Sequence, residues 1–96
     1  MLENKFKTKL VNEIKAIFPG CFIFHLDPNE KQGIPDLLIL HGNKWAALEG
    51  KIRENAPHRP NQDYYVETLG KMSYAAFIYP ENKEKILNEL QQAFKS

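Results

Sequence analysis

The sequence has little cysteine, no long apolar run and almost no excess of charge of either sign. Its single cysteine, Cys21, lies in the apolar run Cys21-Phe22-Ile23-Phe24, which argues against a nucleophile and indicates a buried thiol in a reducing compartment. No apolar stretch approaches the roughly 18 to 20 residues that a membrane span requires. The N-terminal segment alternates charged and apolar residues, which argues against a signal peptide. We therefore expect a soluble, cytoplasmic protein.

The balance of charge, taken alone, disfavours a nucleic-acid partner. The chain has 13 Lys and Arg against 12 Asp and Glu, a formal net charge of +1. Local clusters matter more than the sum, and the densest basic cluster contains Lys51, Arg53, His58 and Arg59. If acidic side chains bind a divalent metal, their charge is neutralised and the remaining surface becomes more basic. The basic cluster is then either a DNA-contacting loop or an ordinary solvated loop.

The pattern of apolar residues predicts one domain over residues 1–96, without repeats or linkers. A helix is expected over residues 2–18, ended by Pro19-Gly20. Short apolar segments predict strands over 21–26, 33–40 and 44–51, and the polar connection at 41–44 makes the second and third strands antiparallel neighbours. The apolar positions of the helix are Leu2, Phe6, Leu10, Ile14 and Ile17.

The second half of the chain continues with a proline-containing loop over residues 53–60. A helix is expected over 61–71, for which Asn61 is the candidate N-cap, and residues 73–79 form a last apolar strand. Asn82 is the candidate cap of a final helix, whose apolar face consists of Ile86, Leu87, Leu90 and Phe94. The predicted order is α-β-β-β-α-β-α.

Charged residues interrupt the second and third predicted strands. Side chains alternate between the two faces of a strand, so Glu49 and Lys51 project from the same side of the sheet. Asp36, in the neighbouring segment, would complete a cluster of two carboxylates and one ammonium group. Taken singly, these residues are a turn acid and an exposed strand pair. Together, inside apolar segments, they require a partner or a bound cation, because burying unpaired charge costs several kcal/mol, roughly.

Pro35-Asp36 and Glu49-Gly50-Lys51 resemble the two halves of the signature of the PD-(D/E)XK nuclease superfamily. The segment 33–37, the hairpin after it, and Gln62 on the following helix are similar to the VRR-NUC branch, which includes stand-alone phage nucleases and is related to Holliday junction resolvases. The resemblance implies an α/β, restriction-endonuclease-like fold, in which helices flank a central mixed β-sheet. It also implies a DNA endonuclease that depends on Mg²⁺, with Mn²⁺ as a substitute, and that acts on Holliday junctions or other branched DNA.

The resemblance also implies roles for individual residues. Asp36 and Glu49 are expected to bind the metal, and Mg²⁺ usually takes one or two protein carboxylates. Lys51 would stabilise negative charge that develops on phosphorus, or hold the attacking water. Gln62 would face back towards the metal, although its alternative role is that of a surface helix former. Gly50 is unexpected within a strand, where it permits a bulge or the close approach of another group.

The family also places an acid on the first helix, where this chain offers Glu3 and Glu13. On a helical wheel the apolar positions centre close to Glu3, while Glu13 falls towards the edge of that face, so Glu3 is the expected metal ligand. Its alternative role is that of a favourable acid in the first turn of a helix. His25 and His58 lack ligand-spaced partners, which disfavours a zinc site.

Three functional hypotheses remain open from the sequence. The first is a structure-specific endonuclease, working as a homodimer in the cytoplasm of a bacterium or a phage-infected host cell, with Arg53, His58 and Arg59 contacting DNA. The second is a non-catalytic nucleic-acid-binding module that keeps the nuclease fold. The third is a nicking or restriction-type endonuclease, which would normally need additional segments for base readout.

Overall fold

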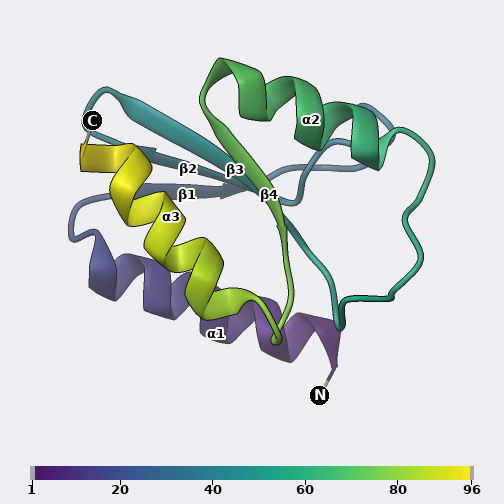
Figure 1. Cartoon of the computed structure of the whole chain (residues 1–96), viewed down its shortest axis with the longest axis horizontal. Helices are drawn as coiled ribbons and strands as arrows, with labels where there is room; N and C mark the ends of the chain where they lie inside the picture. Colours follow the sequence, from purple (N-terminus) through teal and green to yellow (C-terminus); the bar gives the residue numbers. More distant parts are fainter. Residues whose placement is uncertain (1, 96) are drawn as a thin grey trace.

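A four-stranded sheet with helices on both faces forms the structure, a computed structural model that describes residues 2–95 (Figure 1). The elements follow the order predicted from the sequence, α-β-β-β-α-β-α. They are α1 (Glu3–Ile17), β1 (Phe22–His25), β2 (Leu37–His41), β3 (Lys44–Gly50), α2 (Gln62–Met72), β4 (Tyr74–Ile78) and α3 (Lys83–Lys95).

The sheet has the strand order β1-β2-β3-β4 and is mixed. The first three strands form an antiparallel meander, whereas β4 pairs parallel to β3. Gly42, with a φ of +63°, makes the tight β2–β3 turn, which confirms the predicted hairpin. The parallel pairing of β3 with β4 requires a crossover, and α2 provides it.

The core lies between the sheet and the pair α1 and α3, which cover one face, while α2 lies over the opposite face (Figure 1). The period of two in β2 turns Leu37 and Ile39 inward, and both are fully buried. The helical period does the same for Leu10 and Leu90. Burying each such side chain stabilises the fold by about 1.5–3 kcal/mol. No helix within residues 2–95 combines the length and the apolar character needed to cross a membrane.

Several details of the predicted elements are wrong. The strand predicted over 33–40 begins only at Leu37, so Asp36 lies in the loop just before it. Cys21 precedes β1 and is only partly buried.

Leu2 precedes α1 and is 71% exposed, so it does not extend the apolar face of the helix. Asn61 precedes α2, but it has a left-handed φ of 71° and its side chain makes no capping hydrogen bond. The Asn82 side chain bonds backwards along the chain, where its Oδ1 accepts from the Tyr79 N–H at 2.8 Å and its Nδ2 donates to the Phe77 carbonyl at 3.0 Å.

Asn82 therefore supplies backbone partners at the end of β4 instead of capping the helix. Replacing Asn82 with alanine should lower the free energy of unfolding by about 1–2 kcal/mol, because two part-buried backbone groups lose their hydrogen bonds. Urea denaturation measures the change. Asn88→Ala, at an exposed position of α3, is the matched control and should stay within about 0.5 kcal/mol of the parent. A loss of equal size in both variants would contradict this role of Asn82.

Candidate active site

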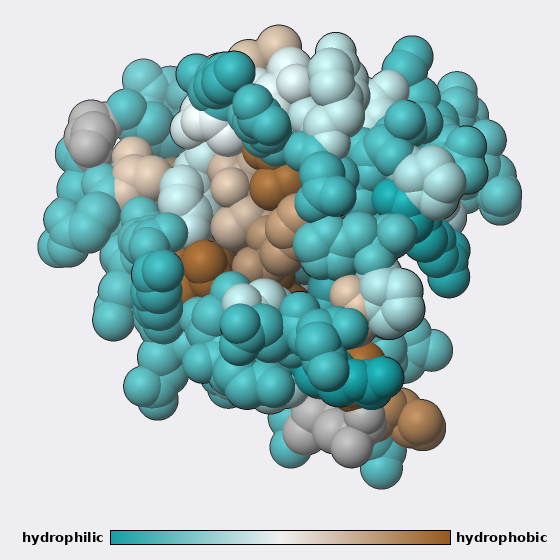
Figure 2. All heavy atoms as spheres, turned by 45° about the vertical axis from the view of Figure 1, so that its right-hand side comes forward, coloured by the Kyte–Doolittle hydropathy of each residue, from teal (hydrophilic) through white to brown (hydrophobic). Residues whose placement is uncertain are grey.

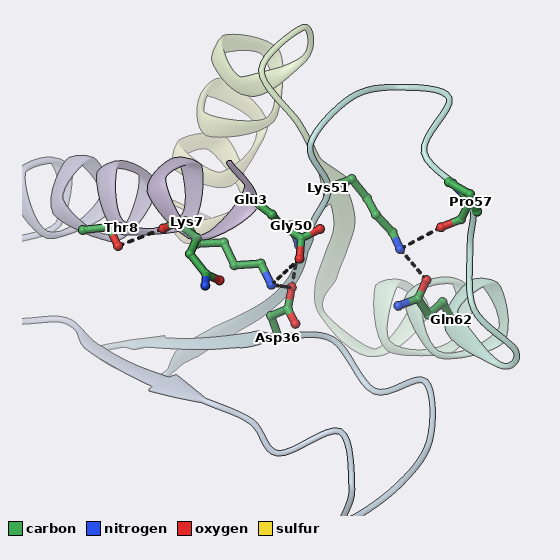
Figure 3. A network of polar contacts seen from close by, with 9 residues as sticks. Glu3, Lys7, Thr8, Asp36, Gly50, Lys51, Pro57 and Gln62 are labelled. Atoms are coloured by element: carbon green, nitrogen blue, oxygen red, sulfur yellow. Dashed lines mark hydrogen bonds and ion pairs between the residues drawn. The ribbon is translucent and has the colours of Figure 1, made fainter. Parts of the chain in front are cut away.

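A pocket of about 360 Å³ brings together most of the residues that the sequence singled out. Asp36, Glu49, Lys51 and Gln62 line it, as do Glu3 and Arg59. It also contains a residue that the sequence analysis did not select, Lys7. In Figure 3, Lys7 and Asp36 point towards each other, while Lys51 points towards Gln62 and the loop that precedes α2.

The pairing of β2 with β3 brings the two carboxylates together. Leu37 pairs with Leu48 in the antiparallel register, so Asp36 and Glu49, one residue further on in opposite directions, lie across from each other. The Gly50 N–H donates to Asp36 Oδ2 at 3.0 Å, which fixes that carboxylate against the end of β3. The pairing register of β2 and β3 therefore brings together the two carboxylates that the sequence analysis expected to form a cluster.

Glu49 is the most electrostatically perturbed group of the pocket. Glu49 is only 5% exposed, and its Oε1 has no hydrogen-bond partner within residues 2–95. Burial, together with the charge of Asp36 and a hydrogen bond to Asp36, raises the pKa of Glu49 to about 8, against the opposing charges of Lys51 and Lys7. Near neutral pH, Glu49 therefore holds a proton that a cation would displace.

Lys51 is buried just beyond the last residue of β3. Its backbone N–H donates to the Ile78 carbonyl at 2.8 Å, which continues the pairing with β4 past the strand end. Its Nζ donates to Gln62 Oε1 at 2.7 Å and to the Pro57 carbonyl at 3.1 Å. Both acceptors are neutral, so they orient the ammonium group without neutralising its charge.

Gln62 is the first residue of α2 and is only 6% exposed, so it is not a surface helix former. Its Oε1 accepts from Lys51 Nζ and from the Arg59 backbone N–H, the latter at 2.8 Å. One amide oxygen thus connects the buried lysine with the loop that carries Arg59. Gln62 is positioned to orient both residues.

Gly33 allows the loop before β2 to pack against the loop before α2. It has a φ of +94°, and a Cβ at this position would lie 2.6 Å from Asn61 Cβ and 2.7 Å from the Pro60 carbonyl oxygen. Any other residue would therefore both strain the backbone and push the loops apart. This contact supports the Gln62 end of the pocket.

The structure reveals an ion pair between Lys7 and Asp36. Its Nζ lies 2.9 Å from Asp36 Oδ2 and 3.3 Å from Glu3 Oε2. Burial lowers the pKa of Lys7, but the hydrogen bond to Asp36 and the charges of Asp36 and Glu3 outweigh that effect and raise it. The sequence did contain a signal, since Lys7 follows Glu3 by one helical turn.

The remaining predicted residues fall into different places. Glu3 lines the pocket, whereas Glu13 pairs with Lys83 of α3 at 2.8 Å and is not among the lining residues. Arg53 lies exposed in the loop. His58 does not line the pocket; its Nδ1 lies 2.8 Å from Asp63 Oδ1, and its ring stacks on Phe77 at 4.1 Å between centroids. Of the expected basic residues, Arg59 is therefore the one beside both Lys51 and the pocket.

No protein-family model matches the sequence, and no curated protein matches it. Comparison with solved structures finds a "VRR_NUC domain protein" with a TM-score of 0.69 and 23% sequence identity, covering 99% of this chain and 89% of that chain. The fold is VRR_NUC-like. This confirms the fold class expected from the sequence.

The fold alone does not show whether the pocket binds a metal ion, so the chemistry of the residues that line it has to decide. Within residues 2–95, no group of three or more His, Cys, Asp or Glu side chains is arranged to hold a metal ion. Asp36 and Glu49 nevertheless fit Mg²⁺, which usually binds through one or two carboxylates and keeps several waters. The unpaired, buried Oε1 of Glu49 needs a partner that a divalent cation would supply.

The raised pKa of Glu49 predicts a pH-dependent stability of the metal-free protein. Between the ordinary value of 4.5 and the folded value of about 8, the folded state binds more protons at Glu49 than the unfolded state does. Stability should therefore fall as the pH rises through this window. Glu49→Gln removes the ionisation, so its stability relative to the parent should increase from about pH 5 to pH 8.

Denaturation in EDTA at several pH values measures this difference. The matched control is Glu67→Gln, at a carboxylate of α2 that is 72% exposed, and its difference from the parent should not vary with pH. A Glu49→Gln difference that stays constant across the same range would contradict the raised pKa.

Proposed function

We propose that the chain is a divalent-metal-dependent DNA endonuclease that uses Mg²⁺, with Mn²⁺ as a substitute. The observation that carries this proposal is the buried Glu49 carboxyl, which lies beside Asp36 and shares its pocket with the ammonium group of Lys51; one of its oxygens has no partner within residues 2–95. A purely structural site would not be expected to keep two mutually destabilising carboxyls and a buried lysine together. The VRR_NUC-like fold supports the same reading.

Hydrolysis of a phosphodiester requires an activated water, relief of negative charge on the phosphoryl oxygens, and help for the departing 3′ oxygen. A bound divalent ion supplies Lewis-acid activation and charge relief. Asp36 and Glu49 would hold it. Lys51, oriented by Gln62 and the Pro57 carbonyl, would stabilise the charge that develops on the phosphoryl group.

The loop between β3 and α2 is the proposed DNA contact. Arg59 lies at the pocket, and its backbone N–H is held by Gln62, so its position is coupled to that of Lys51. Arg53 is exposed on the same loop and is free to reach a neighbouring phosphate. His58 shares the loop, where a protonated imidazole beside Asp63 would contact phosphate more weakly than an arginine would.

We further propose a symmetric homodimer that cuts branched DNA on two strands, since one pocket can act on one strand at a time. Exposed apolar side chains support an interface: Phe22 and Phe24 of β1 are 66% and 52% exposed and lie side by side. Independently of these two residues, Figure 2 shows apolar residues gathered near the middle of one largely hydrophilic face. A twofold dimer would present two basic loops to a junction that has its own approximate symmetry.

The proposed roles predict different losses for two variants. Asp36→Ala should abolish cleavage and weaken metal binding, whereas Lys51→Ala should lower turnover by roughly 10²–10³-fold and keep its metal affinity, because an ammonium group is no ligand. Cleavage in Mg²⁺, with EDTA as the blank, and calorimetric titration with metal measure the two effects. Glu67→Ala and Lys71→Ala, an exposed ion pair on α2, are the controls. Near-normal cleavage by Asp36→Ala would reject the assignment.

The dimer is tested with linear, nicked, flap and four-way DNA. We expect four-way or other branched DNA to be cut fastest and light scattering to report a dimer at micromolar concentration. Mixing active protein with the Asp36→Ala variant should then convert paired cuts into single nicks. A monomer whose nicking is unaffected by the inactive variant would reject the dimer and favour a nicking enzyme.

A further inference from the structure

The ammonium group of Lys7 contacts Asp36, one of the two carboxylates proposed to bind the metal ion. It is 2.9 Å from Asp36 Oδ2, the same oxygen that accepts the Gly50 N–H, and the Lys7 side chain is only 19% exposed. Figure 3 shows this side chain reaching from α1 across to Asp36. In the metal-free protein, Lys7 is thus the counter-charge of Asp36.

The end of β3 is shaped to admit this lysine. A Cβ at Gly50 would lie 3.0 Å from Lys7 Cε and 3.2 Å from Lys7 Cγ, which is tighter than ordinary packing allows. Gly50 has no positive φ that would itself demand glycine. The glycine in the middle of the Glu49-Gly50-Lys51 motif therefore provides room for the methylene chain of Lys7.

Lys7 leaves one part of the site unsatisfied. Glu49 is 5% exposed, and its buried Oε1 has no hydrogen-bond partner within residues 2–95. A divalent ion bound to Asp36 and Glu49 would satisfy it, but a cation at Asp36 would then face the ammonium group at close range. Like charges repel strongly at close range in a site that is partly shielded from water.

We propose that Lys7 is a built-in competitor of the metal ion: its ammonium group neutralises Asp36 in the metal-free protein and must release Asp36 when a divalent ion binds. Glu3, one helical turn before Lys7 and 3.3 Å from its Nζ, retains the lysine after that release. The exchange raises the concentration of free metal at which the site loads. This inference rests on the proposed metal-dependent function of the same pocket.

The test is calorimetric titration of the full chain with Mn²⁺, in the absence of DNA. Lys7→Met keeps most of the methylene chain and removes the charge, so it should bind Mn²⁺ roughly tenfold more tightly than the parent. Lys9→Met, at an exposed position on the same helix, is the matched control and should bind as the parent does.

Gly50→Ala is the second variant, because it keeps Lys7 and every carboxylate but pushes the lysine chain away from Asp36. It should also bind Mn²⁺ more tightly, and it decides the question if Lys7→Met does not fold. Metal binding that is unchanged or weaker in Lys7→Met would overturn the exchange and leave the metal site standing. Failure of the parent and both variants to bind Mn²⁺ at millimolar concentration would reject the metal site, and the exchange with it.

Discussion

The antiparallel register of β2 and β3 places the carboxylates of Asp36 and Glu49 against each other, and neighbouring side chains and backbone groups partly offset the resulting electrostatic cost. The register follows from the hairpin turn and from the burial of Leu37 and Leu48, since a slip by one residue would turn these leucines out of the core. The core thus determines where Asp36 and Glu49 meet. Bringing the two carboxyl groups together costs free energy, and the stability of the sheet outweighs that cost.

Neighbouring elements respond to that constraint in different ways. Helix α1 brings Lys7 to Asp36, and the backbone of β3 donates a hydrogen bond to the same carboxylate. Glu49 receives neither contact on its Oε1, and it is the group whose pKa moves to about 8. Asp36 thus has compensating partners, whereas the Glu49 Oε1 has none within residues 2–95, and this difference supports the proposed cation site.

Much of the fold was predictable because apolar periodicity and turn residues report local structure directly. The strand pair that holds Glu49, with Asp36 just before β2 and Lys51 just after β3, follows from the period of two, and every element was found in its predicted order. The functions of Asn61 and Asn82 were not predictable from residue type. An asparagine before a helix can cap it, adopt a left-handed turn or bond to a preceding strand, and long-range packing decides among these outcomes.

A close approach at Gly50 was anticipated, but Lys7, the residue that makes it, was missed for a related reason. The family resemblance directs attention to an acid on the first helix, which is Glu3, and not to the cation one turn later. The contact of Lys7 with Asp36 joins two segments that no local sequence pattern connects. Gln62 was ambiguous because its propensity says nothing about burial, which depends on how the preceding loop packs against Gly33. Long-range contacts between loops are the part that the sequence does not reveal.

Two lysines lie in the acid-lined pocket, and their partners determine what each can do. Lys7 bonds to carboxylates, so its charge is already neutralised, and a divalent ion would compete with it in the proposed exchange. Lys51 bonds to the neutral oxygens of Gln62 and Pro57, so it is held in place while its charge stays available to an approaching phosphate. The separation of exchangeable from fixed positive charge is therefore the electrostatic basis of the proposed chemistry.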